Sequence, residues 1–118
     1  MSNPRLRQYV QQELTAAASA ERRDDLAAGF RHLERAHVIG QSSTALHTRV
    51  HWLMLRWGLR HRHWREVMGQ VPRLIGAATK TAIGWVPTGN TGGSNVSPFK
   101  AMPIPQDLQA RIDDANAQ

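Results

Sequence analysis

The 118-residue sequence contains no cysteine. Disulfides and thiolate metal ligands are therefore excluded, and their absence fits the reducing interior of a cell. The first residues, MSNPRLRQYVQQE, lack the apolar run of a signal peptide. No segment stays apolar over the length needed to cross a bilayer. We therefore expect a cytoplasmic protein with no membrane partner.

Acidic residues are also scarce. Nine Asp and Glu face fifteen Lys and Arg, which gives a formal net charge of +6. Such a surplus is typical of proteins that bind polyanions, but the aromatic-interleaved motifs of RNA-binding modules are missing. We interpret the arginines as lining solvated helix faces, and we keep a basic nucleic-acid-binding protein as the second alternative function.

Recognisable enzyme motifs are missing as well. The glycine-rich GNTGG stretch follows no predicted strand and precedes no helix, as a phosphate-binding loop would. There is no Gly-x-Ser-x-Gly and no His-Glu-x-x-His. A di-iron bundle would need two Glu-x-x-His motifs, and the chain has one. The sequence therefore predicts no catalytic residue and no organic cofactor.

Helical periodicity is what the chain has in abundance. It predicts four helices within a domain of residues 1–83: about 4–19, from Asp24 or Asp25 to Gly40, from a cap at Ser42 or Ser43 to Gly58, and about 63–82. Pro72 predicts a kink in the fourth. Short turns between amphipathic helices favour an all-α fold of four antiparallel helices.

Each predicted helix carries an apolar stripe that we expect to face the core. The stripes are Leu6, Val10 and Ala17; Leu26, Phe30 and Leu33; Leu46, Val50, Leu53 and Trp57; and Trp64, Met68, Val71 and Ile75. On the fourth helix, Glu66, Gln70 and Arg73 form a polar face. We expect solvent to cover that face, with coverage by the following segment as the alternative.

Residues 84–105 differ sharply from the helical part, because they are rich in Gly, Pro, Asn and Ser. They cannot form a long helix. Six apolar residues nevertheless favour an extended arm packed on the helices over a disordered tail: Trp85, Val86, Val96, Phe99, Met102 and Ile104. Residues 106–118 predict a short C-terminal helix or frayed tail.

Four of the six histidines lie between Arg31 and Trp52. Glu34 and His37 are three residues apart and His47 and His51 are four apart, which are spacings that share one helix face. The helical phase places His37 inward, Glu34 at the edge of the same stripe, and His32 toward solvent. Across the turn, antiparallel partners have residue numbers that add to about 84, so His37 is level with His47 and Glu34 with His51.

Three imidazoles and a carboxylate are the donor set of a tetrahedral zinc site, with iron, manganese or copper(II) as the alternatives. The sequence thus predicts a metal site formed by Glu34, His37, His47 and His51. The competing interpretation is a set of hydrogen-bonded core histidines. Glu13, on the apolar stripe of the first helix, needs a partner such as an arginine. His61 and His63 are expected at the surface.

The strings FRHLERAHVIGQ, HTRVHWLMLRWGLR, REVMGQVPRL and GWVPTGNTGGSNVSPFKAMPIPQDLQ are similar to an uncharacterised family of short bacterial proteins, domain of unknown function 3703. The resemblance covers about residues 30–109. It implies that helices and arm form one unit. It also implies a link to metal handling, because family members lie among bacterial metal-handling genes.

The helices also resemble tetratricopeptide hairpins, although Leu26 and Trp64 are 38 residues apart and the usual repeat is about 34. That resemblance implies packed hairpins and a peptide-binding role. The sequence hypothesis is a helical protein that binds a divalent transition metal, in metal handling or resistance. The first alternative is a metal-free interaction module whose groove or arm binds a protein partner.

Overall fold

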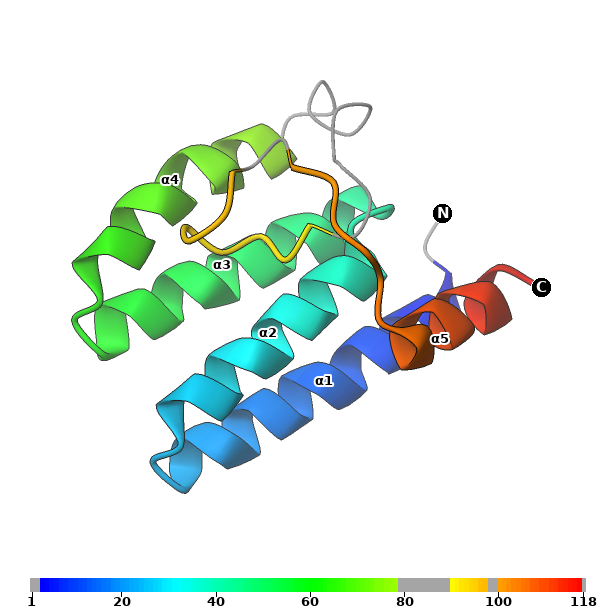
Figure 1. Ribbon diagram of the computed structural model, residues 1–118, viewed down its shortest axis with the longest axis horizontal. Coiled ribbons are helices and arrows are strands. Elements are labelled where there is room, and N and C mark those ends of the chain that lie inside the picture. The colour runs from blue at the N-terminus through cyan, green and yellow to red at the C-terminus, as the bar shows by residue number, and fades with distance from the viewer. Residues whose placement is uncertain (1–2, 79–89, 98–99, 118) are drawn as a thin grey trace.

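The computed structural model describes residues 3–78, 90–97 and 100–117 of the chain. Within these ranges the chain forms five α-helices and no strand (Figure 1). They are α1 (Pro4–Arg22), α2 (Leu26–Gly40), α3 (Thr44–Arg60), α4 (Trp64–Ala78) and α5 (Gln106–Asn116). The predicted all-α class is therefore confirmed.

Side-chain caps begin the first three helices where the sequence offers Asn, Asp and Ser. Asn3 accepts from the backbone N–H groups of Arg5 and Leu6, with Pro4 in the first turn of α1. Asp25 caps α2 and Ser43 caps α3, so the cap is the second residue of each predicted pair. These caps satisfy N–H groups that have no partner inside the helix, and so fix where each helix begins.

The most extensive helix interfaces join α1 to α2 and α3 to α4, and α2 packs on α3 between them (Figure 1). The C-terminal α5 lies against α1 and α2. Arg5 and Tyr9 of α1 both bind the carboxylate of Asp114, and Asn3 donates to the Ala115 carbonyl. The start of α1 is thereby held against the end of α5.

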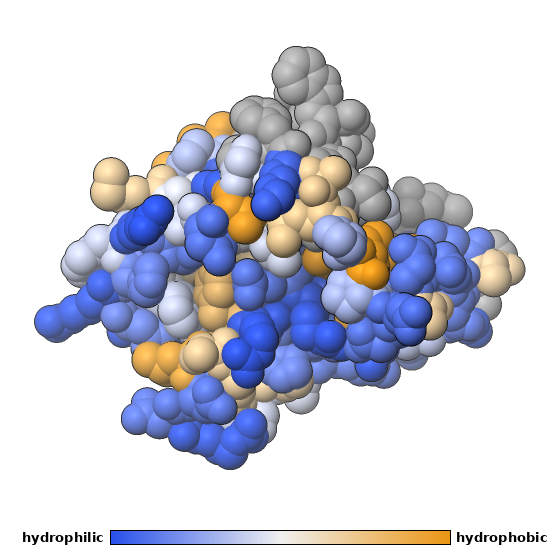
Figure 2. All heavy atoms as spheres, in the orientation of Figure 1, coloured by the Kyte–Doolittle hydropathy of each residue, from blue (hydrophilic) through white to orange (hydrophobic). Residues whose placement is uncertain are grey.

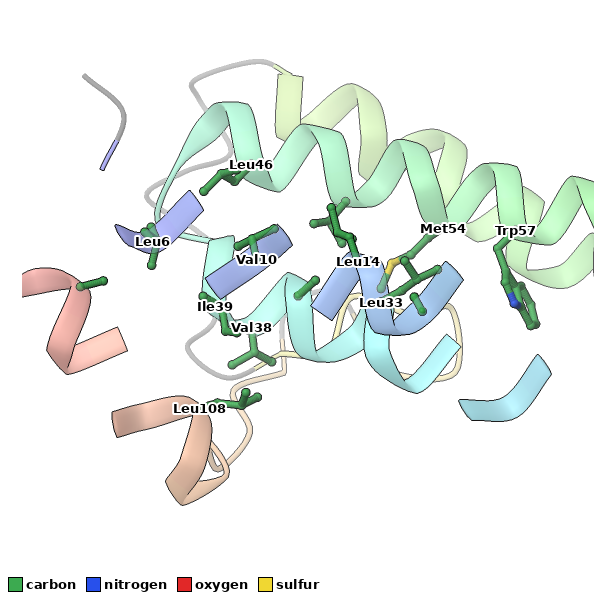
Figure 3. Packing of buried hydrophobic residues seen from close by; sticks show 14 residues of the cluster. Leu6, Val10, Leu14, Leu33, Val38, Ile39, Leu46, Met54, Trp57 and Leu108 are labelled. Atoms are coloured by element: carbon green, nitrogen blue, oxygen red, sulfur yellow. The ribbon is translucent and has the colours of Figure 1, made fainter. Parts of the chain in front are cut away.

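The apolar core lies between α1, α2, α3 and α5 (Figure 3). Its larger members are Leu6, Val10, Leu14, Leu33, Val38, Ile39, Leu46, Val50, Met54, Trp57 and Leu108. Three of the four predicted stripes contribute to it, and α4 contributes no residue.

The prediction for α4 was wrong in orientation. Its apolar residues Trp64, Met68, Val71 and Ile75 are 57%, 76%, 44% and 63% exposed, whereas Glu66 and Gln70 are buried. The predicted solvated polar face is instead covered by residues 92–96, which hydrogen-bond to Glu66, Gln70 and Arg73. Burying these polar groups is tolerable because each has partners. Trp85, Val86 and Phe99 of the predicted arm lie outside the described residues.

Glu13 is buried, and three side chains bind its carboxylate. It accepts from His32 and Arg35 of α2 and from Arg111 of α5, at 2.8, 3.0 and 2.8 Å. Burial raises the pKa of Glu13, but the hydrogen bonds and charges of His32 and Arg35 outweigh it, and the net shift is downward. His32 therefore turns toward α1, where we had expected it to face solvent. The cluster joins three helices and lies outside the histidine site.

Candidate metal centre

His37, His47 and His51 converge on one point between α2 and α3. Their exposed fractions are 2%, 5% and 3%. The Nε2 atoms form a triangle in which every side measures 3.1 Å. These three residues can offer one ligand atom each to a shared metal ion.

The short turn between the two helices creates this convergence. His37 precedes Gly40 by three residues, and His47 follows the Ser43 cap by four. A Cβ on Gly40 would lie 3.0 Å from the Leu46 Cβ and 3.2 Å from the Val10 Cγ2. The missing side chain lets the end of α2 approach the start of α3 closely. His51 is one helical turn beyond His47 and so points the same way.

A backbone carbonyl sets the proton position on His37. Its Nδ1 lies 2.7 Å from the carbonyl oxygen of Asn90. A carbonyl only accepts, so Nδ1 carries the proton and donates. In the neutral ring Nε2 then carries no proton, and its lone pair faces the other two histidines.

A side-chain amide does the same for His51. Its Nδ1 lies 2.6 Å from Oε1 of Gln70. The amide orientation is determined independently, because Nε2 of Gln70 donates to the Glu66 carboxylate at 2.6 Å and to the Gly92 carbonyl at 2.7 Å. Nδ1 of His51 must therefore donate, and its Nε2 is also a lone pair directed at the centre.

His47 differs, since its buried Nδ1 has no hydrogen-bond partner among the described residues. If all three rings are neutral, the three converging nitrogens carry at most one proton, which is on Nε2 of His47. At least two lone pairs then face each other 3.1 Å apart. A cation at the centre would satisfy all three nitrogens at once.

The electrostatic environment keeps the rings neutral at physiological pH. Burial lowers the pKa of His47 and of His51 to about 4. Burial, together with the charges of His51 and His47, places the pKa of His37 well below its usual value. Neutral imidazole is the form that binds metals, so the site needs little proton release to accept one.

The triangle also constrains how a metal would sit. Metal–nitrogen bonds of about 2.0–2.1 Å give nitrogen–nitrogen separations of about 2.9 Å in a facial octahedral site, about 3.3 Å in a tetrahedral one and about 3.6 Å in a trigonal plane. The observed 3.1 Å lies between the first two. At this spacing Nε2 of His37, His47 and His51 would together hold one metal ion and fill three of its coordination positions, leaving at least one for another ligand.

Glu34 lies outside the group of converging ligand atoms. Its side chain faces the 91–93 segment, where the Thr91 side chain hydrogen-bonds to it and Oε2 is 3.6 Å from the position of a Cβ on Gly93. Burial and the charge of Glu66 raise the pKa of Glu34, against the opposing effects of Thr91 and Arg31. The structure thus brings together three of the four predicted ligands.

Gly92 closes the site from the side of the 90–97 segment. Its φ is +83°, and a Cβ there would lie 2.5 Å from Cδ2 and 2.8 Å from Nε2 of His37. Sequence reasoning missed Gly92 and Asn90, and it placed Gln70 in solvent. A Thr-Gly-Gly turn and a glutamine one helical turn from a glutamate were the available signals.

The remaining histidines do not join the centre. The His61 ring hydrogen-bonds to Glu21, which also binds Arg60 at 2.8 and 2.9 Å. His63 is exposed, and its Nδ1 accepts from the Glu66 backbone N–H at the start of α4. His61 is only half-buried, and both residues lie at the α3–α4 turn, away from the cluster.

The described helices include none long and apolar enough to span a membrane. No curated protein and no solved structure matches the chain. A family described as "Protein of unknown function (DUF3703)" matches residues 4–112, which confirms the resemblance expected from the sequence. The chain belongs to the DUF3703 family.

Proposed function

We propose that this protein binds one divalent transition metal ion through Nε2 of His37, His47 and His51, and serves in metal handling or resistance. The observation that carries the proposal is the pair of fixed Nδ1–H groups on His37 and His51. They commit two buried lone pairs to one point at 3.1 Å, an arrangement that is unfavourable without a cation. Ordinary core histidines would instead direct a donor at an acceptor.

Zinc is the first choice for this donor set. Three neutral nitrogens suit zinc, copper(II) or iron, whereas manganese prefers oxygen ligands. Glu34 is placed to face residues 91–93 rather than the three nitrogens, so the open coordination position would be filled by water or by an exogenous ligand. The site would then act in storage, sensing or delivery.

The proposal also assigns roles to the parts of the chain. We propose that α1 to α4 form an antiparallel arrangement that brings the histidines together, and that residues 90–97, the described part of the predicted arm next to them, cover the site. Two hydrogen bonds support that role: His37 bonds directly to Asn90, and Gln70, the partner of His51, bonds to Gly92.

The test is metal titration of untagged, chelator-stripped protein, by calorimetry and by competition with a chromophoric chelator. Zinc, copper(II), iron(II) and manganese(II) are each tried. We expect one ion per chain. His47→Gln should weaken binding by more than about a hundredfold, since losing an outer-shell partner alone costs about 10- to 100-fold. Nδ1 of His47 has no partner to lose, and the amide can donate to the other imidazoles, so this variant should stay folded.

His32→Gln is the matched control, because His32 lies on α2 but binds Glu13 instead of the cluster. It should bind metal as the unchanged protein does. Failure of all four metals to bind, or wild-type affinity in folded His47→Gln, would contradict the proposal.

A further inference from the structure

The outward face of α4 is apolar although the helix packs on the protein with its other side. Trp64, Met68, Val71 and Ile75 are between 44% and 76% exposed, while the buried positions are Glu66, Gln70 and Ala77. At 100° per residue these two sets lie on opposite sides of the helix. Figure 2 shows apolar atoms at the surface along the outer edge of α4.

Two exposed residues of α3 extend this face. Trp52 is 47% and Leu59 is 48% exposed. Each directly follows a residue that faces α4: His51 bonds to Gln70, and a Cβ on Gly58 would lie 3.0 Å from Val67. Trp52 and Leu59, seven residues apart, therefore lie on one side of α3, about 100° around the helix axis from the side that faces α4. The six residues form what we call the outer strip: Trp52, Leu59, Trp64, Met68, Val71 and Ile75.

The strip has the spacing of a helix-docking seam. On α4 the apolar positions recur after four, three and four residues, which places two in every seven on one narrow line. A helix that lies in a lipid surface presents a broader apolar face. The seam from Trp64 to Ile75 is about 17 Å long at 1.5 Å per residue, so a partner helix of three to four turns would cover it.

Positive charge surrounds the strip. Arg56, Arg62 and Arg65 are exposed and form no ion pair with the described part of the chain. Between Thr44 and Ala78 the only acidic residue is Glu66, which is 4% exposed. Two copies of this chain docked through the strip would bring like charges together, which opposes self-association. An acidic partner would be attracted.

We propose that the outer strip docks an acidic amphipathic helix of another protein. The apolar seam supplies the contact area, and the arginines select for glutamate and aspartate flanking the partner's apolar positions. The strip is on the side of α4 away from Gln70, so docking does not need the histidine site to be filled. This inference is independent of the proposed metal site.

The probe is a synthetic 21-residue helical peptide with leucine at the seam positions and glutamate flanking them, labelled for fluorescence anisotropy against the intact protein. We expect saturable binding that falls at least tenfold in Met68→Glu/Ile75→Glu. Both side chains are exposed, so circular dichroism and metal affinity should be unchanged. Gln12→Glu, which adds negative charge on the exposed side of α1, is the control and should bind normally.

Charge selectivity is tested with the same peptide carrying lysine in place of glutamate, and with Arg62→Glu/Arg65→Glu. Both should weaken binding at least tenfold. The proposal is overturned if the acidic peptide does not bind or if the lysine peptide binds equally well. It is also overturned if the seam variants instead abolish binding to phosphatidylglycerol vesicles or duplex DNA, or dissociate a dimer seen by sedimentation.

Discussion

Replacing Gly92 by alanine tests how the 90–97 segment holds the histidine centre. A left-handed φ of +83° costs about 1–2 kcal/mol for a residue with a Cβ. The new methyl would also lie 2.5 Å from Cδ2 of His37, inside van der Waals contact. The ring cannot retreat without losing its 2.7 Å bond to the Asn90 carbonyl, which would leave a buried donor unpaired at about 1–3 kcal/mol.

We therefore expect Gly92→Ala to lose about 2–4 kcal/mol of unfolding free energy, the sum of the conformational cost and part of the lost hydrogen bond. Metal affinity should fall about 10- to 100-fold, as it does when an outer-shell partner is removed. Urea denaturation of the metal-free protein measures the first quantity, and chelator competition measures the second.

The neighbouring glycine provides the matched control. Gly93 has no left-handed φ, and its added Cβ would meet Oδ1 of Asn95, the end of an exposed side chain, at 2.8 Å, and Cε2 of Phe30 at 3.2 Å, where a shift of a few tenths of an ångström relieves the contact. Gly93→Ala should therefore keep metal affinity within about threefold, because a flexible surface side chain can move aside. If Gly92→Ala binds metal as tightly as Gly93→Ala, the segment does not position His37 and the reasoning fails.

Three further outcomes follow from the same geometry. Gln70→Leu removes the partner of the His51 donor and of the Gly92 carbonyl. It should lower metal affinity about 10- to 100-fold, measured by chelator competition, and destabilise the fold by about 1–3 kcal/mol. Unchanged affinity would mean that Gln70 does not support the site. The metal-free protein should lose stability as the pH falls from about 6.5 to about 4, because the folded-state pKa of His47 and of His51 is about 4 and the unfolded chain then binds more protons; urea midpoints that do not change across this range would contradict the assigned burial. Glu13→Gln should cost about 1–3 kcal/mol in thermal unfolding, because its ionic partners are only partly buried, and should leave metal affinity unchanged; a matching loss of affinity would mean that the two clusters are coupled.

The sequence predicts the helices well because their caps and stripes are local features. Ser43, Gly40 and the apolar periodicity are enough to place α2 and α3 and to bring His37 level with His47. Matching residue numbers across a short turn predicts which residues lie level to within about one helical turn. That precision was enough to predict that three imidazole rings of similar length come together.

Two features of the site could not be predicted in this way. Asn90 is 53 positions from His37 and has no regular secondary structure, so no periodic pattern relates the two residues. The predicted orientation of α4 was wrong because a hydrophobic stripe normally faces the core. Here Glu66 and Gln70 turn inward instead, where they bond to His51 and to residues 92–94, and the stripe is left outside.

Glu34 shows the limit of spacing arguments in another way. Its separation of three residues from His37 places both on one side of α2, but a side chain at the edge of the stripe has a choice of directions. Thr91 hydrogen-bonds to it and residues 91–93 face it. The direction of the Glu34 side chain thus depends on a hydrogen bond to Thr91, which lies far away in the sequence and which the spacing within α2 does not reveal.

X-ray absorption spectroscopy of the zinc-loaded protein tests the central claim most directly. The account predicts one zinc per chain, with scattering from three imidazole rings and nitrogen distances of about 2.0–2.1 Å, and one or more oxygen or nitrogen donors at the open position. His47→Gln should reduce the imidazole contribution to two rings. A zinc ion held by oxygen alone or by a single imidazole, or a spectrum that His47→Gln leaves unchanged, would contradict the account.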